Sequence, residues 1–318
     1  MLDLITIGES MLRLSVPPEM LLAEAPHFHV HIAGAESNVA VAVARMGYKT
    51  RWLSRLTDNL LGQRIVRELS SFGVDCSGVV WTTEDRVGTY YLEFGALPRP
   101  TQIIYDRSHS AASRMQADTF DTAQLSQARM LHLTGITPAL SDGCYELVAA
   151  WVEAARQHHV PVVFDVNFRA LLWSPEICAS KLSPLLEGVD LLICGQQDAA
   201  TVFGFKGEPG HVLRALRDRF GAKRAAMTVG EAGAVGLESD TIYTADGYPA
   251  EIVDRIGAGD AFAAGVICGL LENDFALGLR YGVAMSALQL TLSGDLFRLS
   301  RADVLRLMES GVARRPLR

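Results

Sequence analysis

The segment Asp254-Arg255-Ile256-Gly257-Ala258-Gly259-Asp260-Ala261-Phe262 holds the residues of this chain whose types and spacing best suit chemistry. An apolar stretch follows over residues 263–271, which predicts that a helix begins here. A helix N-terminus offers unpaired backbone N–H groups and a positive dipole end, and small residues let an anion come close. We interpret the Gly257–Gly259 backbone as a phosphoryl seat and Asp260 as a base that takes a proton from a hydroxyl. The competing interpretation is a chance Gly-x-Gly pair followed by an Asp that only caps a helix.

A second glycine-led turn lies ahead of another predicted helix, in the sequence Gly34-Ala35-Glu36-Ser37-Asn38. Gly34 allows a ligand to approach the backbone, and Asn38 offers both a donor and an acceptor to a hydroxylated molecule. The same residues would also serve as a plain strand-to-helix turn.

Further polar residues follow predicted strands. Thr228, Gly230 and Gly233 come at the end of one strand, and Arg169 follows another. Ligands of open parallel sheets bind at the carboxyl ends of strands, so we predict nucleotide contacts for the first three. Arg169 is a candidate for holding an anionic substrate group. A hairpin turn and a surface ion pair are the respective alternatives.

Two stretches, over about residues 11–33 and 86–108, alternate in hydrophobicity and contain no predicted helix. They predict a small lid sheet that shields a reaction from water. Within it, Arg107 is a second candidate for an anionic group, and Tyr90 and Tyr105 could hydrogen-bond the substrate. Ion pairing and packing of the lid are the alternatives for these residues.

The rest of the chain alternates between strand-like and helix-like segments, which predicts an α/β fold with a mostly parallel central sheet flanked by helices. The strand candidates are residues 4–8, 130–133, 160–165, 191–194, 225–229 and 234–237. The helix candidates are residues 35–46, 142–157, 211–220, 258–271 and 275–292.

Composition narrows the class of protein. Of the 318 residues, 49% are hydrophobic, which is enough for a large core, and we expect one domain over residues 1–318. The net charge of −7 argues against a nucleic-acid or anionic-membrane partner. No apolar run reaches the roughly 18 residues needed to span a bilayer. The five cysteines are scattered without a C-x-x-C pair, as is typical of reduced thiols in a cytoplasmic protein.

On these residues the chain resembles the ribokinase (PfkB-type) family of carbohydrate kinases. The family's N-terminal signature is similar to Gly34-Ala35-Glu36-Ser37-Asn38-Val39-Ala40, and its C-terminal signature D-T-x-G-A-G-D-x-F is similar to Asp254 through Phe262. Within the family, Leu131-His132-Leu133-Thr134-Gly135 and Asp165-Val166-Asn167-Phe168-Arg169 resemble phrases of 2-keto-3-deoxygluconate kinases. The resemblance extends over essentially the whole chain.

The resemblance implies a ribokinase-like fold with a lid and transfer of phosphate from ATP, with Mg²⁺, to a primary hydroxyl. A monovalent cation could bind as well, and the resemblance implies a homodimer or higher homo-oligomer formed through the lid.

Carried over by position, Asp260 would be the base and Gly257, Ala258 and Gly259 the anion hole. Gly34, Asn38, Tyr90 and Tyr105 would contact the sugar, Arg107 and Arg169 its carboxylate, and Asp295 would match an acidic residue of the subfamily. Thr228, Gly230 and Gly233 would line the nucleotide, and Asp198 would help organise Mg²⁺, directly or through water.

The chain departs from the family pattern on the nucleotide side. Arg255 replaces the usual Thr of the C-terminal signature, and Gly195-Gln196-Gln197-Asp198 stands where the family has N-x-x-E.

From these residues we expect a sugar kinase for an acidic keto sugar, 2-keto-3-deoxygluconate above others. The alternatives are a kinase for a neutral sugar or a nucleoside, such as fructose or ribose, and a sugar or nucleotide sensor that has lost catalysis.

Overall fold

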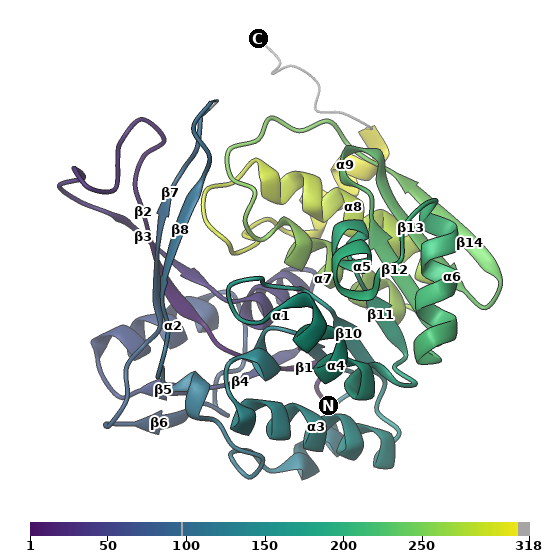
Figure 1. The fold of residues 1–318 in the computed structure, drawn as a ribbon, viewed down its shortest axis with the longest axis horizontal. Helices are drawn as coiled ribbons and strands as arrows, with labels where there is room; N and C mark the ends of the chain where they lie inside the picture. Colours follow the sequence, from purple (N-terminus) through teal and green to yellow (C-terminus); the bar gives the residue numbers. More distant parts are fainter. Residues whose placement is uncertain (97, 311–318) are drawn as a thin grey trace.

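The computed structural model describes residues 1–96 and 98–310, which are built around an eight-stranded sheet (Figure 1). The strand order is β14-β13-β12-β11-β10-β9-β1-β4. Neighbouring strands are parallel along β12-β11-β10-β9-β1-β4, whereas β13 and β14 pair antiparallel at one edge of the sheet. The bounds are β1 (Leu4–Ile7), β4 (Thr50–Leu53), β9 (Leu131–Thr134), β10 (Val162–Asp165), β11 (Leu191–Ile193), β12 (Arg224–Thr228), β13 (Gly233–Glu238) and β14 (Thr241–Asp246).

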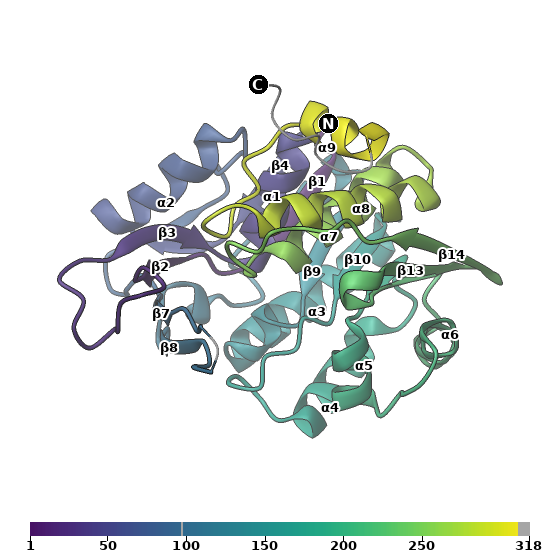
Figure 2. The ribbon, with the colours of Figure 1, turned by 90° about the horizontal axis from the view of Figure 1, so that it is seen from above.

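Helices cover both faces of this sheet, as the view from above shows (Figure 2). On one face lie α1 (Ala35–Arg45), α7 (Ala258–Leu271), α8 (Phe275–Leu290) and α9 (Arg301–Ser310). On the other lie α3 (Asp142–Gln157), α4 (Pro175–Leu186), α5 (Gln196–Phe203) and α6 (Pro209–Phe220). Short 3-10 turns connect some of these elements: η1 (Ala112–Arg114), η2 (Thr122–Gln127), η3 (Thr137–Ala139) and η4 (Gly230–Ala232). The predicted α/β class with a mostly parallel sheet is confirmed.

A large apolar cluster packs on each face of the main sheet. Neighbouring strand residues point to opposite faces, so Val163 belongs to the cluster with α7 and α8, and Phe164 to the cluster with α3 and α4. Burial on both faces explains why the parallel strands read as continuous apolar runs. No helix within the described residues combines the length and the apolar character needed to cross a membrane.

A second sheet of four strands stands beside the main body (Figure 1). Its order is β3-β2-β7-β8, and each alternating stretch of the sequence supplies two strands. Their bounds are β2 (Met11–Ser15), β3 (His29–Ala33), β7 (Thr89–Glu93) and β8 (Gln102–Asp106). The central pair, β2 and β7, is parallel. We call this second sheet the lid.

The lid is supported from behind by α2 (Leu60–Ser71), whose Ile65 and Leu69 pack with Leu12 and Ile32 of the lid strands. A short parallel pair, β5 (Arg55–Thr57) and β6 (Val80–Thr82), lies at the same end of the molecule (Figure 1). Apolar contact on this side leaves the opposite face of the lid turned toward the carboxyl edge of the main sheet.

Candidate active site

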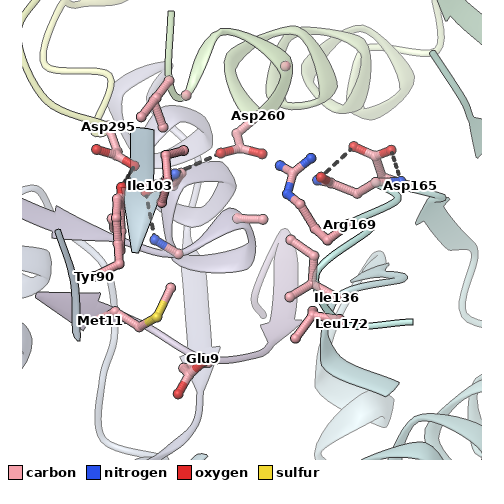
Figure 3. Close-up of a pocket in the computed structure, with 18 of the residues that line it drawn as sticks. Glu9, Met11, Tyr90, Ile103, Ile136, Asp165, Arg169, Leu172, Asp260 and Asp295 are labelled. Atoms are coloured by element: carbon pink, nitrogen blue, oxygen red, sulfur yellow. Dashed lines mark hydrogen bonds between the residues drawn. The ribbon is translucent and has the colours of Figure 1, made fainter. Parts of the chain in front are cut away.

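A cavity of about 900 Å³ lies between the lid and the carboxyl edge of the main sheet (Figure 3). Tyr90 of β7 and Tyr105 of β8 line it from the lid. Asp165 at the end of β10 and Thr228 at the end of β12 line it from the main sheet. Ligands of open α/β sheets bind at this edge, so the two sheets together frame a binding site.

Asp260 lies in the first turn of α7 and faces this cavity. Its side chain is buried, and Oδ2 accepts a hydrogen bond of 2.7 Å from Nδ2 of Asn38. Burial raises the pKa of Asp260 above the ordinary value for Asp, although the Asn38 hydrogen bond and the positive charge of Arg169 oppose the shift. A carboxylate with a raised pKa beside an open cavity is suited to accept a proton.

The backbone next to Asp260 forms an open helix N-terminus. Gly257 precedes the helix with φ 86°, and a Cβ there would lie 2.3 Å from the carbonyl oxygen of Asp295. Only glycine fits that position. A Cβ on Gly259 would meet nothing within 4 Å, so space is open above the unpaired N–H groups. Ala258 belongs to the same turn but is not among the residues lining the cavity.

The α7 helix is held in place by close contact with α8. A Cβ on Gly265 would lie 2.3 Å from the backbone nitrogen of Gly282, and one on Gly269 would lie 2.1 Å from Cα of Gly278. These glycines let the two helices approach with their backbones almost touching. The first turn of α7, and Asp260 with it, is therefore carried by a rigid helix pair.

The glycine-led turn at the N-terminus meets the same site. Gly34 precedes α1, and a Cβ there would lie 2.1 Å from the carbonyl oxygen of Glu9. Asn38 Oδ1 accepts a hydrogen bond from the backbone N–H of Gly34 at 3.4 Å while its Nδ2 donates to Asp260. The Gly34 N–H thus orients the amide through its oxygen, and the amide nitrogen binds Asp260.

Two more carboxylates, those of the buried Asp165 and the half-buried Asp198, line the cavity near Asp260. Burial and the negative charges of Asp260 and Asp198 raise the pKa of Asp165 to about 8. Asp198 sits in the first turn of α5, where Oδ2 accepts the backbone N–H of Phe168 at 3.2 Å, and burial raises its pKa as well. The site therefore gathers carboxylates whose ionised forms a cation would stabilise.

Arg169 is the cation that reaches into this region, with its guanidinium between Asp260 and Asp165 (Figure 3). Its side chain is exposed, and among the described residues it forms no ion pair within 4 Å. Its charge is thus available to an anionic ligand.

Arg107 also lines the cavity, but the structure gives it a partner that the sequence analysis did not identify. Nε of Arg107 donates to Oε2 of Glu9 at 2.8 Å, and the hydroxyl of Ser110 donates to Oε1 of the same carboxylate. The ion pair is largely buried, with 10% of the Arg107 side chain and 2% of the Glu9 side chain exposed. Arg107 therefore brings less free charge to the cavity than Arg169 does.

On the lid side, Tyr90 and Asp295 come together as cavity-lining residues. The Tyr90 hydroxyl donates to Oδ2 of Asp295 at 3.0 Å. Oδ1 of Asp295 accepts from Nη1 of Arg13 at 2.7 Å, and Arg13 itself is fully buried behind the cavity wall. Burial raises the pKa of Asp295 to about 6, while Arg13 and Tyr90 hold it lower than burial alone would.

Only some of the residues predicted to contact the nucleotide line the cavity. Thr228 and Asp198 line the cavity, whereas Gly230 and Gly233 do not. Gly233 has φ 108°, and a Cβ there would lie 2.1 Å from the carbonyl oxygen of Ala245, so the tight turn between β12 and β13 explains this glycine. Arg255 is exposed and lines the cavity beside the Gly257–Gly259 turn.

Three buried residues of this region were missed by the sequence analysis: Glu9, Arg13 and Glu36. Glu36 lies in the first turn of α1, where Thr134 and Thr137 donate to its Oε1 at 2.7 Å each, and burial raises its pKa to about 7. A signal was present for Arg13, because it interrupts the apolar sequence Met11-Leu12-Arg13-Leu14. A charged residue within such a strand needs a buried partner.

Comparison with known proteins shows that residues 1–300 match the pfkB family of carbohydrate kinases. The chain belongs to this family. The pfkB match includes both glycine-led turns and every cavity residue described above. The protein is therefore a carbohydrate kinase, that is, a phosphotransferase with an alcohol group as acceptor.

Relatives of this pfkB kinase share its full length. A 2-dehydro-3-deoxygalactonokinase from Haloferax volcanii is 35% identical, with 98% of each chain covered. The crystal structure of a 2-dehydro-3-deoxygluconokinase from Thermotoga maritima is 32% identical, with a TM-score of 0.92 over 97% of this chain and 98% of that one. A putative ribokinase II from E. coli, solved with ATP and Mg²⁺, is 19% identical with a TM-score of 0.88 over 97% and 99% of the two chains, and shows the shared fold.

Proposed function

We propose that this carbohydrate kinase transfers the γ-phosphoryl group of ATP to the terminal hydroxyl of an acidic keto sugar of the 2-keto-3-deoxygluconate type, with Asp260 as the general base. The observation that carries the proposal is that the buried Asp260 carboxylate and the open N-terminus of α7 face the same cavity as the exposed Arg169. The base, the backbone N–H groups of Gly257–Gly259, which we call the anion seat, and the carboxylate receptor thus face one cavity.

The chemistry follows from these positions. Asn38 holds Oδ2 of Asp260, and the carboxylate takes the proton of the sugar hydroxyl as that oxygen attacks the γ-phosphorus. The new O–P bond forms as the bond from phosphorus to the bridging β–γ oxygen breaks, and ADP leaves with that oxygen. Backbone N–H groups at Gly257–Gly259 stabilise the negative charge on the transferred group.

The carboxylates on the nucleotide side fit Mg²⁺. In proteins this ion is usually held by one or two carboxylates together with substrate phosphates and waters. Within residues 1–96 and 98–310 no group of three or more His, Cys, Asp or Glu side chains could hold a metal by itself, whereas Asp198 and Asp165 both line the cavity. Asp198, directly or through water, and Asp165 would hold the ion, which when bound neutralises charge on the phosphates.

An acidic substrate is supported by Arg169 and by the relatives. Guanidinium pairs well with a carboxylate, and the charge of Arg169 is not used in an ion pair among the described residues. The names of the relatives from Haloferax volcanii and Thermotoga maritima both specify a 2-dehydro-3-deoxy sugar acid as acceptor. A neutral sugar would give Arg169 no anionic partner. Arg107 remains a second candidate, although Glu9 already pairs with it.

The nucleotide side carries an extra positive charge in this chain. Arg255 lines the cavity next to the anion seat, and we assign it to the phosphates of ATP. The assignment gives a role to the residue that departs from the family signature. Thr228, at the end of β12, would contact the nucleotide as well.

The assembly and location of the protein are part of the same proposal. The lid ends in two edge strands, β3 and β8, and Ile104 on β8 is 55% exposed. Such an edge favours pairing with a second lid, so we expect a homodimer or a higher homo-oligomer. The five cysteines are free, which fits the reducing cytoplasm.

The test is release of ADP with a panel of acceptors: 2-keto-3-deoxygluconate, 2-keto-3-deoxygalactonate, fructose, ribose and adenosine. We expect the highest kcat/KM for a 2-keto-3-deoxy sugar acid. A preference for a neutral acceptor would contradict the acidic-substrate assignment. Absence of ADP release with every acceptor would favour the sensor alternative.

A further inference from the structure

A fully buried cluster of charges lies behind the cavity wall, outside the reacting groups described above. At its centre is Arg13 of β2, whose side chain is 0% exposed. Nη1 donates to Oδ1 of Asp295 at 2.7 Å, and Nη2 donates to Oδ2 of Asp254 at 2.6 Å. One guanidinium thus bridges two carboxylates that are 1% and 3% exposed.

The two carboxylates belong to different parts of the site. Asp254 opens the signature segment, where its Oδ1 accepts the N–H of Ile256 and its Oδ2 that of Gly294, both at 3.1 Å. These bonds shape the backbone immediately before the anion seat. Asp295 lines the cavity and also accepts the hydroxyl of Tyr90 from the lid.

Three further contacts connect the lid to the anion seat. The carbonyl oxygen of Asp295 lies against Gly257, where a Cβ would come within 2.3 Å of it. Gln289, fully buried on α8, donates Nε2 to the carbonyl of Gly294 at 2.7 Å and to that of Ile256 at 3.4 Å. The segment around residue 256, the segment around residue 294 and the lid strand β2 are therefore joined by polar contacts.

We propose that Arg13 is a positioning residue that fixes the lid and the anion seat in one arrangement and keeps Asp295 as an oriented hydrogen-bond acceptor for a hydroxyl of the sugar. Arg13 does not line the cavity, so it acts through Asp295 and Asp254. The proposal rests on the sugar-kinase function above and adds the residue that couples sugar recognition to the site of phosphoryl transfer.

The cluster also determines which group takes up a proton when Arg13 is removed. The charged and titratable groups around Asp295 are Arg13 on β2, Tyr90 on β7 and Asp254 before α7, with His31 on β3 and Arg298 near Gly294. Without Arg13 two buried carboxylates are left side by side, and one of them takes up a proton. Asp254 retains two backbone N–H donors and Asp295 retains only the Tyr90 hydroxyl, so the proton goes to Asp295.

The consequence has a definite direction. Arg13 lowers the pKa of Asp295, so its removal raises that pKa above its wild-type value of about 6. A protonated Asp295 is a poorer acceptor for a sugar hydroxyl. Sugar binding in the variant should therefore weaken as the pH falls through the new pKa and recover at higher pH.

The test compares Arg13→Met, Arg13→Lys and the control Arg51→Met. Arg51 is a partly buried arginine that pairs with Asp75 at 2.8 Å outside the cavity. Hydrogen exchange is measured over residues 89–93 and 254–260, and kcat and KM for the best acceptor of the panel are measured against pH. Lys keeps the charge but can reach only one carboxylate well, so it provides a milder variant if Arg13→Met folds poorly.

We expect Arg13→Met to exchange faster in both segments, and the acid limb of kcat/KM for the sugar to move up by about 1–3 pH units. The acid limb of the pH profile of kcat at saturating sugar should not move, because the protonation of Asp260 sets that limb. Arg13→Lys should show a smaller shift, and Arg51→Met none.

Unchanged exchange over 254–260 in both Arg13 variants would overturn the proposal whatever the substrate is. Faster exchange with an unmoved acid limb would also overturn it, because Arg13 would then serve the fold alone. A wild-type protein that phosphorylates no acceptor would defeat the proposed function, and hydrogen exchange would still decide whether Arg13 couples the lid to the seat.

Discussion

Asn38 on α1 donates its side-chain amide to Oδ2 of Asp260 on α7 at 2.7 Å, across 222 residues of sequence. The two glycine-led turns that stand out in the sequence are therefore in direct contact. One turn carries the proposed base, and the other holds that base in place. This contact makes the protonation of Asp260 the first property to test.

Replacing Asp260 by Asn should remove most turnover and leave the fold intact. The change keeps the shape of the side chain and removes the proton acceptor, and general-base catalysis contributes about 10²–10⁴-fold. The measurement is kcat with sugar and ATP saturating, with sugar affinity followed by calorimetry. Asp240→Asn, at an exposed carboxylate on the far edge of the sheet, is the matched control. Near wild-type kcat in Asp260→Asn would rule out Asp260 as the base.

Replacing Asn38 by Ala should move the acid limb of kcat to higher pH. The hydrogen bond from Asn38 lowers the pKa of Asp260, so its loss raises that pKa further. The base is active when deprotonated, and activity is therefore lost at a higher pH than in the wild type. A hydrogen bond to a charged group is worth about 1.5–3 kcal/mol, which corresponds to a shift of roughly 1–2 pH units. Ser37→Ala, in the same turn, should leave the limb where it is.

Substitutions of Gly257 and Gly259 in the anion seat should affect stability and activity in different ways. Gly257→Ala places a Cβ against the Asp295 carbonyl at a residue with φ 86°, so we expect loss of stability by more than about 1 kcal/mol. Gly259→Ala meets nothing within 4 Å and lies in a helix, so stability should be unchanged or rise by about 0.5–1 kcal/mol.

Activity provides the contrasting measurement for these two variants. The methyl group of Gly259→Ala would occupy the space left for the phosphoryl group, so kcat should fall strongly in a protein that melts no earlier than the wild type. If Gly259→Ala retained full activity, the phosphoryl group would not lie above this turn.

Arg169→Gln should reduce the preference for an acidic sugar more than Arg107→Gln does. The Arg107 guanidinium is already paired with Glu9, whereas that of Arg169 is not in an ion pair among the described residues. Loss of a charge-assisted hydrogen bond of about 1.5–3 kcal/mol raises KM for the acidic sugar by roughly 10–100-fold. Comparing KM for 2-keto-3-deoxygluconate and fructose in both variants measures the effect. Equal losses for the two sugars would show that Arg169 does not recognise the carboxylate.

Arg255→Thr, which restores the family residue, should weaken nucleotide binding and leave KM for the sugar unchanged. Arg255 is exposed, so an effect of about 0.2–1 kcal/mol is expected, or at most roughly fivefold in KM for ATP, declining with added salt. Arg280→Thr, at an exposed arginine of α8 away from the cavity, is the control. An unchanged KM for ATP would leave Arg255 without a role in phosphate binding.

The sequence predicted the parts of the structure that depend on local pattern. The buried parallel strands, the α7 and α8 helices and the turn with Asp260 follow from apolar runs and from glycines next to an acid. The edge strands β4 and β14, and helices such as α2, were not predicted. β14 and α2 are mostly exposed or half-buried, and β4 is only four residues long, so each gives a weak signal.

The ion pairs of the site were harder to predict from the sequence than its helices, strands and turns. Arg107 was recognised as a candidate, but Glu9, its partner 98 residues away, was not. Arg13 and Asp295 are separated by 282 residues, and nothing local links them. The pairing of buried charges depends on how the lid meets the main sheet, which only the three-dimensional structure supplies.

The distance between Arg13 and its partners along the chain bears on how the protein is made. Arg13 is synthesised more than 200 residues before Asp254 and Asp295. A buried guanidinium without a carboxylate is strongly unfavourable, so the β2–β7 pair cannot settle into its final position in a partial chain. The lid should therefore be the last part of the nascent protein to become protected from proteases, and synthesis past residue 295 should be the event that completes it.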